Sequence, residues 1–213
     1  MSMPRIDGEA SLPGTRRNLS LHRSLAILGS IAIVALLECS LTAQTQTAAK
    51  PDASASRAAF LEFYRVLASP RCQNCHPAGD APLQGDDSHV HLQNVKRGAD
   101  GHGVTAMRCD TCHQTANLPG AHVPPGNPKW SLPSPEHKMV FAGRSAAELC
   151  KQIKDPKQNG GRSLENLLDH VANDDLVGWG WSPGDGRTLP PLSRTETVAQ
   201  MKIWIAGGAA CPE

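Results

Sequence analysis

Apolar side chains recur at helical spacing in four stretches of the chain, and these stretches predict its regular structure. The first, residues 57–68, places Phe60, Phe63 and Leu67 on one face, which is typical of an amphipathic helix. Three further stretches show a similar pattern and predict helices at residues 145–151, 163–172 and 195–206. The pattern therefore predicts a mainly α-helical fold.

The segments between these helices are long loops rich in glycine and proline. Residues 77–103 contain several short turn sequences, and residues 118–135 contain six prolines. Proline at this density excludes a regular helix or a central strand. We expect residues 118–135 to form an extended strap, carrying Trp130, that either covers one face of a bound group or lies on the surface as a loop.

The first 43 residues have the pattern of a secretory signal peptide. A basic region with Arg16, Arg17 and Arg23 comes first. An apolar run at residues 24–37 follows, and Ala43 offers a small residue at the cleavage point. The apolar run is too short to span a bilayer comfortably. We therefore expect export to the periplasm.

Two alternatives to cleavage remain open at the N-terminus. An uncleaved segment would tether the protein to the membrane. Cys39 could instead carry a lipid, although Glu38 directly before it fits that role poorly. With cleavage after Ala43, we expect residues 44–56 to be a flexible leader and residues 57–213 to form a single domain.

The mature chain has little apolar material for a core of its own. Aromatic residues make up 4% of the sequence, which contains 19 glycines and 17 prolines. Cleavage after Ala43 would leave 17 basic and 17 acidic side chains, and no basic patch interrupts this balance. This composition argues against nucleic acid as a partner. A bound apolar group would supply the missing core.

Two copies of the pentapeptide pattern Cys-x-x-Cys-His, at residues 72–76 and 109–113, supply the candidate chemistry. This pattern is the attachment site of c-type haem. Each cysteine forms a thioether with a haem vinyl group, and the histidine ligates the iron. We therefore expect two haem c groups. The attachment residues would be Cys72, Cys75, Cys109 and Cys112, and the proximal iron ligands would be His76 and His113.

Zinc and disulfides are the alternative uses of paired cysteines. In zinc ribbons the two pairs typically lie about 15–20 residues apart, whereas residues 76–108 separate Cys75 from Cys109 here. Zinc would also leave both motif histidines without a role. A thioredoxin-like thiol pair would need a βαβ pattern, which is not visible in the sequence. Structural disulfides would make two identical pentapeptides a coincidence.

Cys150 and Cys211 remain once the motifs and the signal peptide are set aside. An even remainder in an oxidising compartment predicts a disulfide, which would tie the C-terminus to the domain. The alternative is a pair of free buried thiols.

Each haem iron has a sixth coordination position, and its occupant sets the chemistry. We expect His91 and His170 as the distal ligands. His91 lies between the motifs, and His170 lies on the flank of an apolar helix face, where an unpaired imidazole is costly. The alternatives are His122, in the proline-rich strap, and Met139.

Three stretches of the chain, PRCQNCHPAGDAPLQGDD, MRCDTCHQTANLPG and NGGRSLENLLDHV, resemble a family of exported bacterial dihaem cytochromes c. Some members are the cytochrome subunits of isoquinoline 1-oxidoreductase-type molybdenum hydroxylases. The resemblance covers most of residues 57–212. It implies a small, haem-cored cytochrome c domain that transfers electrons from a periplasmic dehydrogenase to the respiratory chain. No molybdenum site is visible in the sequence, so hydroxylase chemistry would belong to another subunit.

These observations favour an electron carrier over an enzyme. The chain holds enough histidines and methionines to fill the sixth coordination position of both irons. Its partners would then be redox proteins, a donor dehydrogenase and a respiratory acceptor. The alternative is a haem enzyme, a peroxidase or small-molecule reductase, with one open coordination position. A haem-based sensor would need an output domain, for which the mature chain leaves little room.

Overall fold

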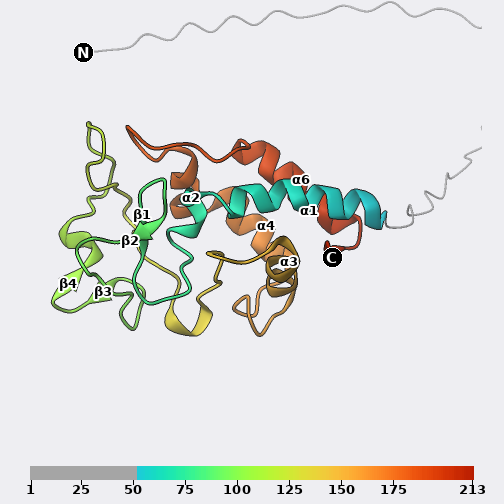
Figure 1. Ribbon diagram of the computed structural model, residues 1–213, viewed down its shortest axis with the longest axis horizontal. Helices are drawn as coiled ribbons and strands as arrows, with labels where there is room; N and C mark the ends of the chain where they lie inside the picture. The colour runs from blue at the N-terminus through green and yellow to red at the C-terminus, as the bar shows by residue number, and fades with distance from the viewer. Residues whose placement is uncertain (1–51) are drawn as a thin grey trace, which may run out of the picture. The chain divides into compact units, whose positions relative to one another are not determined.

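A computed structural model describes residues 52–213 (Figure 1). The expected signal peptide, residues 1–43, lies outside these residues. Helices account for 40% of the described residues and strands for 5%, which confirms a mainly α-helical fold. The helices are α1 (Ala53–Leu67), α2 (Pro70–Gln73), α3 (Ala146–Lys154), α4 (Leu164–Asn173), α5 (Asp175–Gly178) and α6 (Arg194–Ala206). The strands are β1 (Leu83–Gln84), β2 (His89–Val90), β3 (Gly103–Val104) and β4 (Met107–Arg108).

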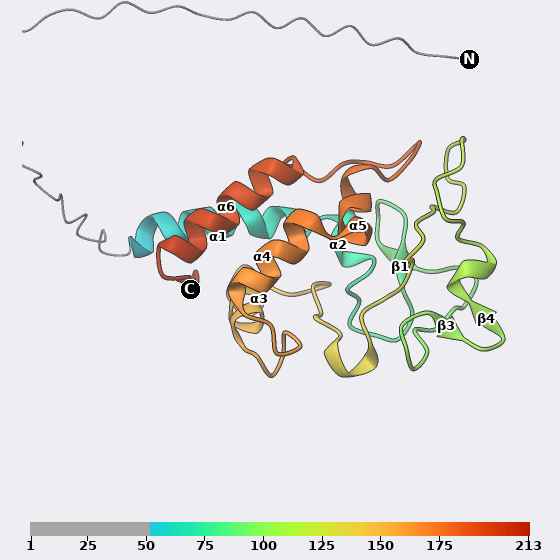
Figure 2. The same cartoon turned by 180° about the vertical axis from the view of Figure 1, so that it is seen from behind.

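The apolar core lies between α1 and α6, which run side by side in both views (Figures 1 and 2). The ring of Phe60 on α1 lies 5.1 Å from that of Trp204 on α6, measured between ring centroids, and Phe63 lies 6.5 Å from the same ring. These three aromatic side chains are fully or almost fully buried. Much of the small aromatic complement of the chain is thus concentrated in one place.

The C-terminus is fastened to this core in two ways. Cys150 on α3 forms a disulfide with Cys211, as predicted, with the two Cα atoms 5.6 Å apart. The buried hydroxyl of Ser56 donates a hydrogen bond to the carbonyl of Trp204 and accepts one from the amide of Ala210. The last residues of the chain are therefore held against the first turns of α1.

The first helix begins earlier than the sequence predicts. Residues 53–56, expected in the flexible leader, form the first turn of α1, and the Asp52 carboxylate accepts hydrogen bonds from the amides of Ser54 and Ala55. Asp52 is thus an N-cap, which satisfies amide groups that have no partner within the helix. The other predicted helices are confirmed, with boundaries shifted by up to three residues.

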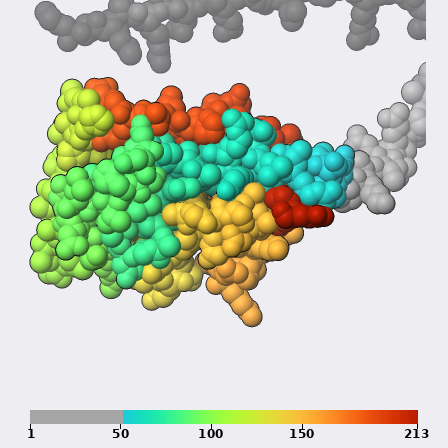
Figure 3. All heavy atoms as spheres, in the orientation of Figure 1, coloured from blue at the N-terminus to red at the C-terminus, as the bar shows by residue number. Residues whose placement is uncertain are grey.

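The segment between α2 and α3 is built differently from the helical part. It consists of loops and two antiparallel hairpins, β1–β2 and β3–β4, each with strands of two residues. Apart from Pro77, its buried apolar side chains are Leu132 and Phe141, and Phe141 packs into the core of the helical part. Figure 3 shows the loops of this segment, in green, gathered at one end of the visible face. This segment lacks an apolar core of its own.

None of the helices within residues 52–213 combines the length and the apolar character that crossing a membrane requires.

Candidate haem sites

The first motif lies at the end of α2. Pro70 occupies the first turn of this helix, where its missing amide costs nothing. The amides of Cys75 and His76 both donate to the carbonyl of Cys72, so the chain continues turning through the motif. This turn brings Cys72, Cys75 and His76 to the wall of one cavity of about 480 Å³, which falls in the size range of small-molecule and cofactor sites.

His76 is fixed in position by two neighbours from the segment before α3. Its Nδ1 donates a hydrogen bond to the carbonyl of Met139 at 2.7 Å. The Phe141 ring stacks on the imidazole, with centroids 3.9 Å apart and planes 15° apart. Because a carbonyl can only accept, the proton sits on Nδ1 and the Nε2 lone pair is free to bind a metal.

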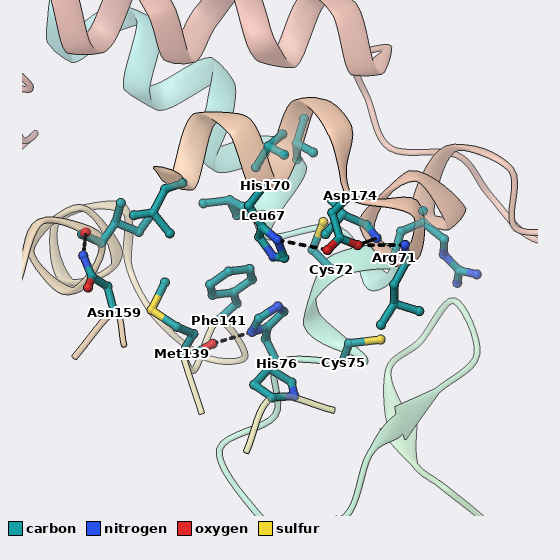
Figure 4. A pocket seen from close by; sticks show the side chains of 18 of the residues that line it. Leu67, Arg71, Cys72, Cys75, His76, Met139, Phe141, Asn159, His170 and Asp174 are labelled. Carbon is teal, nitrogen blue, oxygen red and sulfur yellow. Dashed lines mark hydrogen bonds and ion pairs between the residues drawn. The ribbon is translucent and has the colours of Figure 1, made fainter. Parts of the chain in front are cut away.

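His170, from α4, lines the same cavity. Figure 4 shows its ring on the opposite side of the cavity from His76, with Cys72 and Cys75 to one side and Met139 to the other. Its Nδ1 lies 3.4 Å from a carboxylate oxygen of Asp174. A carboxylate behind a histidine is a common support for a metal ligand, because it orients the ring and raises its basicity.

Burial determines the protonation states of the histidines and cysteines that line this cavity. It lowers the pKa of His76 to about 4, and it also lowers the pKa of His170. Both imidazoles are therefore neutral at neutral pH, as metal ligation requires. Burial raises the pKa of the Cys72 thiol to about 12 and that of Cys75 to about 11. Such a site disfavours thiolates and suits neutral sulfur, as in a thioether.

The second motif has a similar histidine environment, built from different residues. Its cysteines belong to the turn Cys109–Thr111 and the residue after it, and Cys112 is exposed. His113 Nδ1 donates to the carbonyl of Pro125 at 2.7 Å. The indole of Trp130 stacks on the His113 ring, with centroids 4.4 Å apart and planes 14° apart. The proline-rich strap therefore supplies both supports of this histidine.

His91 faces the second motif histidine. The ring centroids of His91 and His113 lie 6.3 Å apart, with the planes at 61°. Imidazole nitrogens bind first-row metals at about 2.0–2.1 Å, and the nitrogen lies about 1.1 Å from the ring centre, so two imidazoles on opposite sides of one metal have centroids about 6.3 Å apart. Burial lowers the pKa of both histidines, so both are neutral at neutral pH. The pair has the spacing of two axial ligands.

Aromatic contacts connect the two sites. Trp130, stacked on His113, meets Trp179 edge to face with centroids 4.8 Å apart. Trp179 in turn lines the first cavity. The histidine pairs therefore belong to one continuous arrangement.

The structure separates the expected distal ligands from their alternatives. His170 and His91 each lie with a motif histidine. His122 is exposed and has a positive φ of 62° within a turn. Met139 lines the first cavity, but its carbonyl accepts the hydrogen bond from His76, which places its backbone on the proximal side.

Several supporting residues were not predicted from the sequence. Phe141 and Trp130 stack on the motif histidines, and Asp174 supports His170. His89 resembles a supported ligand as well, since Asp87 binds its Nδ1 at 2.6 Å and its Nε2 is buried without a partner among the described residues. Of these supporting residues, Trp130 is the one that the sequence indicated, because it is an aromatic residue inside a proline-rich segment.

Within residues 52–213, no three His, Cys, Asp or Glu side chains gather around a common point where they could hold a metal ion. Each site instead offers two histidines. A porphyrin supplies four ligands to its iron and leaves two axial positions for protein side chains, so the residues present fit a haem at both sites.

Comparison with protein-family models, curated proteins and solved structures finds no match to this chain.

Proposed function

We propose that the protein is an exported dihaem cytochrome c that carries single electrons from a donor dehydrogenase to the respiratory chain. The observation that carries this proposal is the pairing of each motif histidine with a second histidine. His76 shares a cavity with His170. The ring centroids of His113 and His91 lie 6.3 Å apart. Two cysteines adjoin each pair, as covalent attachment of haem requires.

In this proposal the cysteines attach haem, and the haem iron supplies the one-electron chemistry. His76 and His113 bind from one side, held by the carbonyls of Met139 and Pro125. His170 and His91 would supply the second imidazole at each site. The aromatic rings stacked on the motif histidines restrict their rotation, so that little reorganisation accompanies a change in iron charge.

The second histidine at each site supports a carrier over an enzyme. A peroxidase or reductase needs one iron with a free position for its substrate. Here a neutral imidazole is available opposite each motif histidine, and both are poised to ligate at neutral pH. An imidazole at the sixth position leaves electron transfer as the remaining chemistry.

The test is to produce the protein with a haem-attachment system and to measure its haem content and its response to carbon monoxide. We expect two haems per chain that resist acid–acetone extraction and a reduced spectrum that carbon monoxide leaves unchanged. Absence of covalent haem would contradict the proposal. Binding of carbon monoxide to one haem would instead favour the enzyme.

A further inference from the structure

The four histidines of the two proposed haem sites do not have the same group behind the ring. The two motif histidines donate their Nδ1 protons to backbone carbonyls. Of the four, His170 alone is paired with a carboxylate in the described part of the chain, since Oδ2 of Asp174 lies 3.4 Å from its Nδ1. The first site therefore has an anionic group behind one of its histidines, and the second site has none.

Asp174 is fixed by its position between two helices. It follows the end of α4 and is the N-cap of α5, where its Oδ1 accepts hydrogen bonds from the amides of Leu176 and Val177 at 2.8 and 3.2 Å. The Arg194 guanidinium donates to the backbone carbonyl of Asp174. The other carboxylate oxygen is left facing His170, and both side chains line the first cavity (Figure 4). The cap of α5 thus also aims the carboxylate at the histidine.

The negative charge of this carboxylate is not neutralised by a neighbouring cation. Within residues 52–213, no lysine or arginine nitrogen lies within 4.0 Å of the Asp174 carboxylate, whose ion-pair partner is His170. The cations that line the cavity are either paired with other carboxylates or exposed to solvent, which screens their charge: Arg71 with Asp86, Lys129 with Asp175, and the exposed Arg162. The carboxylate therefore acts chiefly on His170.

A carboxylate behind an axial imidazole changes the redox balance of the iron. It accepts the Nδ1 proton and makes the ring a more basic ligand. A more basic ligand stabilises the ferric state, which carries the larger positive charge, over the ferrous state. Hydrogen bonding behind an axial ligand is one of the means by which a protein sets the potential of a haem. The described structure provides a carboxylate for this purpose at one of the two sites.

We propose that Asp174 lowers the reduction potential of the first haem below that of the second, so that the first electron to enter the protein comes to rest on the second haem. This inference rests on the proposed function, because it assigns an order to the two haems that the function requires. The step is an exchange between the irons, in which the first returns from ferrous to ferric as the second is reduced. Asp174 is a positioning residue, because it acts through His170.

The experiment is a redox titration of the purified holoprotein and of its Asp174→Asn variant. Asparagine is as good an N-cap as aspartate, so the variant keeps the cap of α5 and removes the charge. We expect two separate reduction steps in the wild type. In the variant, the ferrous-to-ferric ratio of the lower-potential haem at fixed electrode potential should rise by about tenfold, equivalent to about 59 mV. The other haem should keep its potential, so the two steps approach each other.

Electron paramagnetic resonance of the ferric haems identifies which haem is which. The signal that changes in His170→Ala belongs to the first haem. In the wild type, this signal should be the last to disappear on stepwise reduction, because the haem of lower potential is reduced last. The same signal should shift in Asp174→Asn, since the bond from Asp174 orients the His170 ring. A purely structural role of Asp174 would lower thermal stability and leave this signal in place.

Two matched variants control for the loss of a capping group and of a charge. Asp52→Asn removes the same charge from the N-cap of α1, which faces no histidine of either site. Asp175→Asn removes the charge of the neighbouring residue, which is exposed and paired with Lys129. Both should leave the two potentials and both signals unchanged. A shift in Asp175→Asn as large as that in Asp174→Asn would overturn the inference, because any nearby charge would then have the same effect.

Failure of this inference is distinguishable from failure of the proposed function. Wild-type protein without covalent haem would overturn both. Wild-type protein with two haems would overturn this inference alone if Asp174→Asn left the potentials and the signal of the first haem unchanged. Reduction of the first haem before the second in the wild type would also overturn this inference alone, because the order of the two potentials would then be reversed.

Discussion

His76 and His113 are oriented alike by unrelated parts of the chain. Each donates its Nδ1 proton to a backbone carbonyl at 2.7 Å and carries an aromatic ring stacked on its face. The sequences around the two motifs share no pattern that would produce this result locally. This common environment keeps Nε2 unprotonated and fixes its direction, as the proposed binding of a metal requires.

The distal histidines can be tested one at a time. Replacing His170 with alanine removes the imidazole opposite His76, and we expect carbon monoxide to bind one of the two haems in the reduced protein. His91→Ala should expose the other haem, and the double variant should bind two equivalents. The measurement is a carbon monoxide titration followed by absorbance.

His122→Ala is the control for these variants, because the His122 side chain is exposed and lies with neither motif histidine. It should retain the wild-type spectrum. A His170→Ala protein that binds no carbon monoxide would show that another side chain, such as Met139, already closes that iron.

The candidate attachment residues and motif histidines can be predicted from the sequence. The groups that hydrogen-bond to these histidines cannot. The pattern Cys-x-x-Cys-His is recognisable from its residue types alone, and it predicts covalent attachment of haem. The hydrogen-bond acceptors of His76 and His113 are backbone carbonyls, which every residue possesses, so Met139 and Pro125 carry no distinguishing mark. The proposed distal ligands fall between these cases, since context favoured His91 and His170 among several histidines.

At the scale of elements, the helices are defined by their ends as much as by their apolar faces. α6 begins with a capping box, in which Ser193 accepts from the amide of Glu196 and the Glu196 carboxylate accepts from the backbone and hydroxyl of Ser193. α3 begins with the same arrangement between Ser145 and Glu148. Such signals are local and recognisable in the sequence, although it was the apolar spacing that predicted these helices.

Replacing Ser193 with alanine should lower the free energy of unfolding by about 1 kcal/mol, which corresponds to a fall in Tm of about 2–4 °C for a protein of this size. Thermal unfolding monitored by circular dichroism provides the measurement. Ser134→Ala is the matched control, because Ser134 precedes the turn Pro135–His137 but makes no side-chain capping bond. Equal losses in the two variants would rule out a capping role for Ser193.

The hairpins illustrate where prediction from sequence fails. β1–β2 and β3–β4 have two residues per strand, too few for an alternating pattern to be recognised. Their geometry depends on close backbone contacts at glycine. A Cβ on Gly98, which has φ +71°, would lie 2.2 Å from the carbonyl oxygen of Gly103. Contacts of this kind join residues that no local sequence pattern relates.

At the scale of the whole described structure, the helical part is held by its own core and by the Cys150–Cys211 disulfide. This bond closes a loop with a sequence separation of 61 residues. Replacing both cysteines with alanine should lower the free energy of unfolding by up to about 4 kcal/mol, because the unfolded chain gains freedom. Urea denaturation measures the loss. The haem spectrum should not change, since neither cysteine adjoins a histidine pair, and an altered spectrum would contradict this separation of roles.

The loop part between α2 and α3 depends on a different source of stability. Pro77, Leu132 and Phe141 are its buried apolar side chains, and Phe141 packs into the helical core, so these loops cannot be ordered by apolar packing among themselves. His113, Trp130 and His91 nevertheless converge within them. A porphyrin held by these side chains would supply the apolar surface around which the loops pack.

Replacing Cys109 and Cys112 with alanine would prevent attachment of the proposed second haem and should therefore loosen this part selectively. We expect amide protection in residues 103–133 to fall by about tenfold or more, a loss of about 1.4 kcal/mol, as measured by hydrogen exchange with mass spectrometry. Amides of α1 and α6 serve as the internal control and should keep their protection, because their core of Phe60, Phe63 and Trp204 is independent of the second site. Unchanged protection in the loops would show that they fold without this haem, and the second site would then need another explanation.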